Sequence, residues 1–206
     1  MNASLDSYLS KVTFGDMQQF EKMGVIPIFS PLNECLDYLT LSEALMKQVI
    51  TVTEVSEGGS VPELKVINKA DKPVFLLDGE ELVGAKQNRI VNTSILLQER
   101  SETIIPVSCT EQGRWSYASR EFHDSGVVLS SKIRSKKVAS VSDSLKMHER
   151  YDSNQHAIWE DIASISEQED VRSNTSAMRE VFEKRKHDLD EYLKALKHNP
   201  GQKGLL

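Results

Sequence analysis

The sequence predicts an α+β protein: a mostly antiparallel β core with the helical C-terminal third of the chain packed on it. Two observations carry this prediction. From about residue 20 to 130, short apolar runs rich in β-branched residues recur between turn residues, a pattern typical of a meandering sheet. After about residue 144, apolar residues recur at helical spacing instead. We therefore expect a single domain over residues 1–206, with its β-rich core at about 20–130 and its helical region at about 144–198.

Six segments are predicted as strands. Val25–Phe29 is an apolar run that ends before Pro31, and Val49–Val55 is dense in β-branched residues. The later segments are separated by stretches that contain turn residues such as glycine, asparagine and proline. These later strands are expected at Leu64–Asn68, Val74–Leu77, Ile90–Leu97 and Glu102–Thr110.

Helices are predicted within and after this β region. Thr40-Leu41-Ser42-Glu43 fits a capping box, so a short helix is expected from Leu41 to about Lys47. Apolar residues at helical spacing indicate a second helix around residues 153–168. A longer apolar stripe predicts one helix from Asn174 to Lys197, stopped by Asn199-Pro200-Gly201 and packed on the sheet.

Residues 130–144 are polar and serine-rich, and we interpret them as a loop. This loop carries a basic cluster of Lys132, Arg134, Lys136 and Lys137. Its expected role is a solvated surface, and a rim that steers anions is the alternative.

Composition excludes several classes of protein. The net charge of −6 argues against a general nucleic-acid coat, which needs an excess of Lys and Arg. Residues 63–140, with 12 basic and 10 acidic side chains, are the one third of the chain with a positive balance, so an anionic ligand is expected there. The N-terminal residues lack the pattern of a signal peptide, and no apolar run is long enough to span a bilayer.

The two cysteines, Cys35 and Cys109, are too few for a disulfide framework, so a reduced cytoplasmic protein is expected. Cys109 is interpreted as a buried, inert thiol. The five histidines show no ligand spacing and are expected on the surface, so no metal-ligating residue is assigned. Carboxylates alone could still hold a divalent cation. The histidines are His123, His148, His156, His187 and His198.

A dense polar stretch, Asp78–Arg89, interrupts the predicted sheet. If strand alternation runs through Glu80 and Glu81, one carboxylate faces the core and needs a partner, for which Lys86 and Arg89 are the obvious choices. The donors that follow suit phosphate, ribose hydroxyls or a carboxylated small molecule. Those donors are Lys86, Gln87, Asn88, Arg89 and Asn92. The alternative is a structural turn with an ion-pair network.

A second polar stretch, Ile105–Trp115, is predicted as a strand that breaks into a turn at Gly113. The turn brings Glu111, Arg114 and Trp115 together, and an arginine beside an indole could hold a phosphate next to a stacked base. For Trp115 taken alone, packing in the core is the expected role.

These two stretches resemble the signature of a bacterial and archaeal family named for its association with ADP-ribosylglycohydrolases and with rhodanese- or phosphatase-like proteins. The matching segments read LLDGEELVGAKQNRIVNTSILL and IIPVSCTEQGRW. The resemblance extends from YLTLSEAL to PGQ near the C-terminus. The family pattern continues past PGQ into another strand, whereas this chain ends at Leu206, so that strand is expected to be short or missing.

The resemblance implies a role with NAD-derived nucleotides, namely binding or hydrolysis of ADP-ribose or a related phosphorylated nucleotide. In the enzyme hypothesis, carboxylates act as general base or metal ligand and the basic side chains neutralise phosphate. The candidate catalytic residues are Glu80, Glu81 and Glu111. The candidate ligand-binding residues are Lys86, Gln87, Asn88, Arg89, Asn92, Arg114 and Trp115. The alternatives are a non-catalytic ligand-binding module and an interaction scaffold in which the motif is a buried ion-pair network.

Overall fold

The computed structural model describes residues 3–31 and 36–206, so Cys35 lies outside the described residues. Contacts along the chain divide it into two compact units, Asp37–Lys184 and a smaller unit formed by Met1–Leu36 with Arg185–Leu206. Helices make up 29% and strands 30% of the structure, and the sheets are mostly antiparallel, which confirms the predicted α+β class.

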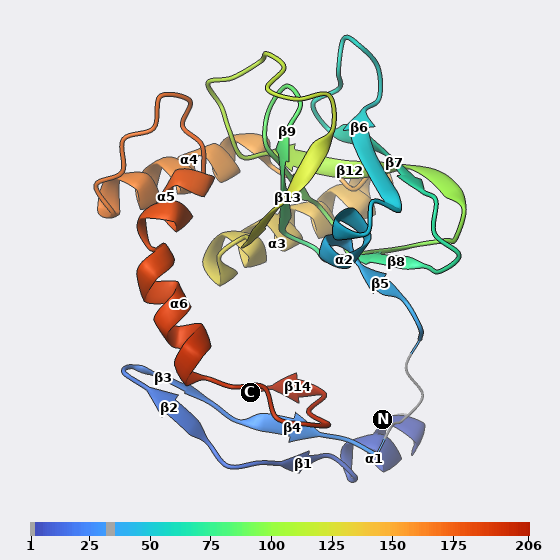
Figure 1. Cartoon of the computed structure of the whole chain (residues 1–206), viewed down its shortest axis with the longest axis vertical. Helices are drawn as coiled ribbons and strands as arrows, with labels where there is room; N and C mark the ends of the chain where they lie inside the picture. The colour runs from blue at the N-terminus through green and yellow to red at the C-terminus, as the bar shows by residue number, and fades with distance from the viewer. Residues whose placement is uncertain (1–2, 32–35) are drawn as a thin grey trace. The chain divides into compact units, whose positions relative to one another are not determined.

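The smaller unit consists of short elements from both ends of the chain (Figure 1). Its elements are α1 (Ala3–Leu9), β1 (Thr13–Phe14), β2 (Gln18–Phe20), β3 (Met23–Val25), β4 (Pro27–Phe29), α6 (Lys186–Ala195) and β14 (Gly204–Leu205). The predicted strand Val25–Phe29 is therefore split between β3 and β4. The last strand, expected to be short or missing, is present as β14, which pairs with β4.

The larger unit is built on a curled six-stranded antiparallel sheet in the order β13-β9-β10-β12-β7-β6 (Figure 1). Its outer strands approach each other at a bridge between Thr53 and Glu121, so the sheet nearly closes on itself. These strands are β6 (Ile50–Glu54), β7 (Glu63–Asn68), β9 (Glu80–Gly84), β10 (Arg89–Val91), β12 (Ser101–Cys109) and β13 (Phe122–Val128). A smaller sheet contains β5 (Leu39–Thr40), β8 (Val74–Leu76) and β11 (Ile95–Leu97).

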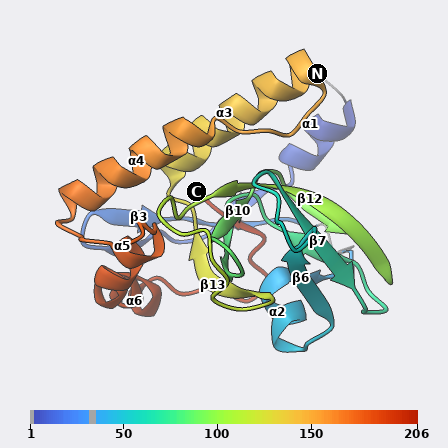
Figure 2. The same ribbon diagram turned by 90° about the horizontal axis from the view of Figure 1, so that it is seen from above.

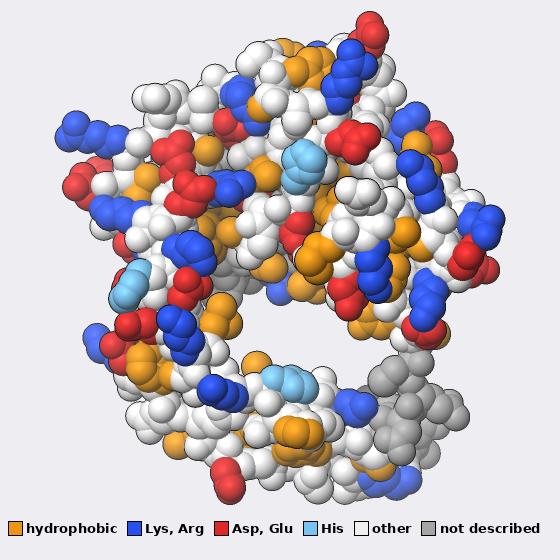
Figure 3. Space-filling view, in the orientation of Figure 1, with side chains coloured by type: hydrophobic (Ala, Val, Ile, Leu, Met, Phe, Trp, Pro, Cys, Tyr) orange, Lys and Arg blue, Asp and Glu red, His pale blue; other side chains and the backbone are white. Residues whose placement is uncertain are grey.

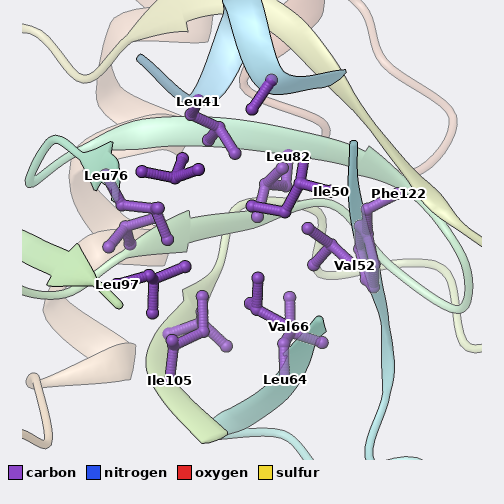
Figure 4. Packing of buried hydrophobic residues seen from close by; sticks show 14 of the residues in the cluster. Leu41, Ile50, Val52, Leu64, Val66, Leu76, Leu82, Leu97, Ile105 and Phe122 are labelled. Atoms are coloured by element: carbon purple, nitrogen blue, oxygen red, sulfur yellow. The ribbon is translucent and has the colours of Figure 1, made fainter. Parts of the chain in front are cut away.

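The main hydrophobic core fills the inside of this curl (Figure 4). Leu64, Val66, Leu82 and Ile105 are among its fully buried side chains. The helix α2 (Leu41–Met46) packs against it and begins with the predicted capping box, in which Thr40 and Glu43 bond each other reciprocally. The predicted strand Ile90–Leu97 is split, because the chain leaves the large sheet after β10 and joins the small one as β11.

Helices from the later part of the chain lie over the outer face of the sheet (Figure 2), and a second apolar layer joins them to it. It contains Ile90 from β10, Ile133 from α3 (Ser131–His148), Ile158 and Ile162 from α4 (Gln155–Gln168), and Met178, which precedes α5 (Arg179–Lys184). The helix predicted at 153–168 is confirmed by α4.

The predicted loop over residues 130–144 is wrong, because this segment forms most of α3. Its buried face is Ile133, Lys137 and Val141, and a lysine in the middle of that stripe hides the helical period. Lys137 is fully buried instead of solvated, and it donates to Asp78 and to the carbonyls of Val91 and Asn92.

The single helix predicted from Asn174 to Lys197 is also wrong. The chain is helical only in α5 and α6, with a break at Arg185. Residues before α5 instead pair with the end of β12, through a bridge between Ala177 and Glu111 and a hydrogen bond from Gly113 N–H to the Thr175 carbonyl at 2.8 Å. Gly113 permits this approach, since a Cβ there would lie 2.9 Å from Thr175 Cα.

Candidate functional site

The two polar stretches meet at one end of the curled sheet. Arg89 at the start of β10 pairs directly with Cys109 at the end of β12. The β9–β10 turn therefore lies against the loop that follows β12.

Glu111 is the centre of a buried hydrogen-bond network. Its Oε2 accepts from Arg114 Nη2 at 2.6 Å and from the Asn88 backbone N–H at 3.1 Å, while Oε1 accepts from Thr175 Oγ1 at 2.8 Å. Burial alone would raise the pKa of Glu111, but these donors lower it below the ordinary glutamate value. We call this cluster, with Gln87, the Glu111 network.

Arg114 is fully occupied within the same network. Besides Glu111, its guanidinium donates to the carbonyls of Gly84, Ala85 and Ser116 and to Asn88 Oδ1. These bonds tie the loop after β12 to the β9–β10 turn. Arg114 and Asn88 therefore act on the shape of the site and have few groups left for a ligand.

Arg89 is different, because it is fully buried and only partly satisfied. Its Nη1 donates to Gln87 Oε1 at 2.8 Å, and Gln87 Nε2 in turn donates to the Glu111 carbonyl. Within the described part of the chain, Arg89 Nε and Nη2 have no hydrogen-bond partner.

The buried carboxylate is Glu81, on the face of the sheet that the helices cover, and its predicted pairing with Lys86 or Arg89 is wrong. Glu81 lies opposite Ile90, whereas Arg89 lies opposite Leu82, so Glu81 and Arg89 point to opposite faces of the sheet. Glu81 Oε1 accepts from Thr110 Oγ1 at 2.7 Å. Burial raises the pKa of Glu81 to about 7, against the effect of the Thr110 and Ser125 hydroxyls.

The other predicted side chains lie apart from the Glu111 network or have structural partners. Glu80 is half-buried and accepts from the Leu77 N–H at 2.7 Å. Asn92 accepts from Ser108 and donates to the Tyr151 carbonyl, on the side of the sheet that the helices cover. Cys109 is buried, as expected, and burial raises the pKa of its thiol. All five histidines are exposed.

Trp115 does not pack in the core as expected, since 47% of its surface is exposed. The turn at Gly113 carries it away from the sheet, and its ring packs on cations instead. Lys86 Nζ lies 5.3 Å and Arg89 Cζ 5.6 Å from its ring centre. Lys86 Nζ also lies 5.1 Å from the ring of Tyr117, so two aromatic side chains flank one ammonium group.

Beside this cluster lies a cleft of about 680 Å³, which we call the Glu54 cleft. It is lined by Thr53, Glu54, Ser56, Glu57, Tyr117 and Arg120. Glu54 is 6% exposed; its Oε1 accepts from the Lys86 N–H at 3.3 Å, and its Oε2 has no partner among the described residues. Glu54 was not predicted as a site residue, although it continues the alternation of the buried Ile50 and Val52 on β6.

Charge on the rest of the larger unit is mixed. Over the face seen in Figure 3, basic and acidic side chains are interspersed.

Among residues 3–31 and 36–206, no group of three or more histidine, cysteine, aspartate or glutamate side chains is arranged to hold a metal ion. No helix in the described part of the chain is long and apolar enough to cross a membrane.

Fold and site together define an α+β protein in which the loops at one end of a curled antiparallel sheet enclose a buried polar network. The chain belongs to the family of the ARG and Rhodanese-Phosphatase-superfamily-associated Protein domain, whose model matches residues 11–206. This confirms the predicted resemblance, and the family name links the chain to ADP-ribosylglycohydrolase and rhodanese-phosphatase contexts. Comparisons with curated proteins and with solved structures give no match.

Proposed function

We propose that this protein binds ADP-ribose or a related ribonucleotide in the Glu54 cleft. The observation that carries the proposal is the Glu54 carboxylate, which is buried in the cleft wall with Oε2 unpartnered among the described residues. A buried carboxylate oxygen without a donor is costly, so a ligand that supplies hydroxyl donors would bind favourably there. Ribose offers two such hydroxyls.

The rest of the cleft suits the other parts of a nucleotide. Tyr117 is exposed and offers a ring on which a base can stack. Arg120 lines the same cleft and adds a positive charge that favours an anionic ligand. The volume of about 680 Å³ lies within the range of small-molecule sites. The family's ADP-ribosylglycohydrolase context supports the same ligand class.

The geometry favours binding over hydrolysis. Both oxygens of Glu111 are occupied by donors, so it could accept a proton only by breaking the Glu111 network. Glu81 faces the opposite side of the sheet from Arg89, and Glu80 is bonded to the backbone outside the Glu54 cleft. None of the three predicted catalytic carboxylates lines the cleft. The scaffold alternative is supported by the Glu111 network itself, which joins three segments of the chain.

A thermal-shift panel tests the proposal with ADP-ribose, NAD, ATP and ribose 5-phosphate, each with and without Mg²⁺. A ligand at about a hundred times its Kd stabilises the folded state by roughly 2.7 kcal/mol, which is readily measured as a rise in Tm. We expect ADP-ribose or a close relative to raise Tm in the wild type and in Glu102→Gln, a surface control, but much less in Glu54→Gln. A cooperative melt that none of these ligands shifts would favour the scaffold.

A further inference from the structure

The guanidinium of Arg89 is a buried cation whose hydrogen bonding is incomplete. It is fully buried, and its one hydrogen bond of full geometry among the described residues goes to the neutral Gln87 side chain. Cys109 and Glu54 attract it electrostatically, but Nε and Nη2 have no hydrogen-bond partner among the described residues. Arginine stays charged in proteins, and buried donors of a charged group without acceptors are unfavourable. An anion that accepts hydrogen bonds from Arg89 would therefore bind favourably here.

The two unpartnered groups of Arg89 lie on the same edge of its guanidinium. Nε–H and Nη2–H point in parallel, and this edge binds two oxygens of a carboxylate or phosphate side by side. The opposite nitrogen, Nη1, is held by Gln87, which fixes the plane of the group. Gln87 is anchored in turn to the Glu111 carbonyl at 2.9 Å.

Trp115 covers this cation. Its ring packs against the Arg89 and Lys86 cations, while 47% of its own surface faces solvent. Gly59 in the β6–β7 loop lies next to both Trp115 and Glu54. A Cβ at Gly59 would lie 3.3 Å from both Trp115 Cζ2 and Glu54 Oε2. Glu54, Lys86 and Arg89 are therefore grouped around one half-exposed side chain, Trp115.

We propose that Arg89 is a phosphate-binding residue, and that a ligand phosphate displaces Trp115 and accepts hydrogen bonds from Nε and Nη2, with Lys86 as a second cation. This inference rests on the proposed function and deepens it: the nucleoside part lies in the Glu54 cleft, and the phosphate lies beside Arg89. The ligand class is thus a ribonucleoside phosphate, bound more tightly than the corresponding nucleoside.

Calorimetric titration at constant ionic strength tests this with adenosine, AMP, ADP-ribose, inorganic phosphate and acetate. In the wild type we expect AMP and ADP-ribose to bind about tenfold or more tightly than adenosine, as charge-assisted bidentate bonds imply. Arg89→Gln should reduce this preference to about twofold or less while adenosine affinity is retained. The matched control Arg100→Gln alters an exposed arginine paired with Asp71 and should keep the full preference. Acetate should not compete with AMP, whereas a carboxylate site would be blocked by it.

If Arg89→Gln does not fold, two other measurements decide. Arg89→Lys keeps the charge but loses the paired donors, and it should reduce the AMP preference by about fivefold. In the folded wild type, AMP should change the fluorescence of Trp115, assigned by comparison with Trp115→Phe, more strongly than adenosine does. Equal affinity for adenosine and AMP would overturn this inference and leave the proposed function intact. If inorganic phosphate binds but adenosine does not, the phosphate site at Arg89 would stand and the nucleotide site in the Glu54 cleft would be overturned. If none of the ligands binds, both proposals would be overturned.

Discussion

At the scale of single residues, the motif divides into side chains that shape the site and side chains that remain open to a ligand. Glu111, Arg114, Asn88 and Gln87 bond one another and the backbone. Arg89 and Glu54 each keep unpartnered buried atoms. The sequence places Gln87 and Asn88 in one polar stretch and Glu111 and Arg114 in another. That the two stretches meet follows from the pairing of β10 with β12, and separating the two groups needed a count of each side chain's hydrogen bonds.

Glu111→Gln should destabilise the fold. Arg114 would keep its buried position but lose its ion-pair partner, whose side chain is 7% exposed. Breaking a buried ion pair costs about 3 kcal/mol or more. Urea denaturation measures the loss, with Arg100→Ala as a control in which an exposed pair should contribute less than about 1 kcal/mol. A loss below about 1 kcal/mol in Glu111→Gln would contradict the structural role of the network.

Glu81 predicts the pH dependence of stability. Its folded pKa is raised from 4.5 to about 7 by burial, so the folded state holds a proton that the unfolded state has released between these two values. The contribution of Glu81 to stability is therefore greatest below pH 4.5, falls as the pH rises, and is smaller by about 3 kcal/mol above pH 7. Urea denaturation of the wild type and of Glu81→Gln at pH 5, 6, 7 and 8 measures how the free energy of unfolding depends on pH. Glu81→Gln should lack the decline. Equal dependence on pH in the two proteins would exclude a raised pKa of Glu81 as its cause.

At the scale of elements, α3 and the region before α5 show where periodicity fails. The apolar stripe of α3 includes Lys137, which is buried because Asp78 and two carbonyls satisfy its ammonium group. The segment before α5 has helical spacing but bonds to the end of β12. Both errors come from partners distant in sequence, which a local pattern does not contain. The six predicted strands and the capping box depend on local signals and are present, although two of the strands are split. Two strands of the large sheet, β9 and β13, were not predicted, and β9 lies in the polar stretch that we expected to interrupt the sheet.

Lys137→Ala should therefore weaken the attachment of α3 to the sheet and lower the free energy of unfolding more than substitution of an exposed lysine does. It leaves Asp78 with Arg134 as its one remaining charged partner among the described residues, and we expect a loss of about 3 kcal/mol. Lys136→Ala is the matched control, because Lys136 is exposed and pairs with Asp161. Equal losses in the two variants, measured by thermal and urea unfolding, would show that α3 is not anchored by this buried pair.

At the scale of the whole molecule, the sequence established the fold class and the family, because both rest on patterns that run the length of the chain. The two compact units were not predicted, since one of them joins segments from both termini. The Glu54 cleft was also missed, because it forms between loops that follow β6 and β12 and has no contiguous motif. The single domain expected over residues 1–206 stays a prediction.

A fragment of Asp37–Lys184 tests that prediction. Both hydrophobic clusters lie within this range, so the fragment should fold alone and unfold in one cooperative transition. The smaller unit has few buried apolar side chains; among the described residues they are Val25 and Pro27. Circular dichroism measures whether the fragment folds, and thermal unfolding measures whether it melts in one cooperative transition. A fragment that lacks a cooperative melt would show that the two units form one folding domain.

Binding of a ribonucleotide in the Glu54 cleft can be measured by calorimetric titration of ADP-ribose into wild-type protein, Glu54→Gln and Glu102→Gln. We predict one site per chain in the wild type and the control, with affinity reduced about tenfold or more in Glu54→Gln, as expected when a charged acceptor of ribose hydroxyls is lost. No binding to folded wild-type protein, or equal affinity in Glu54→Gln, would contradict the account.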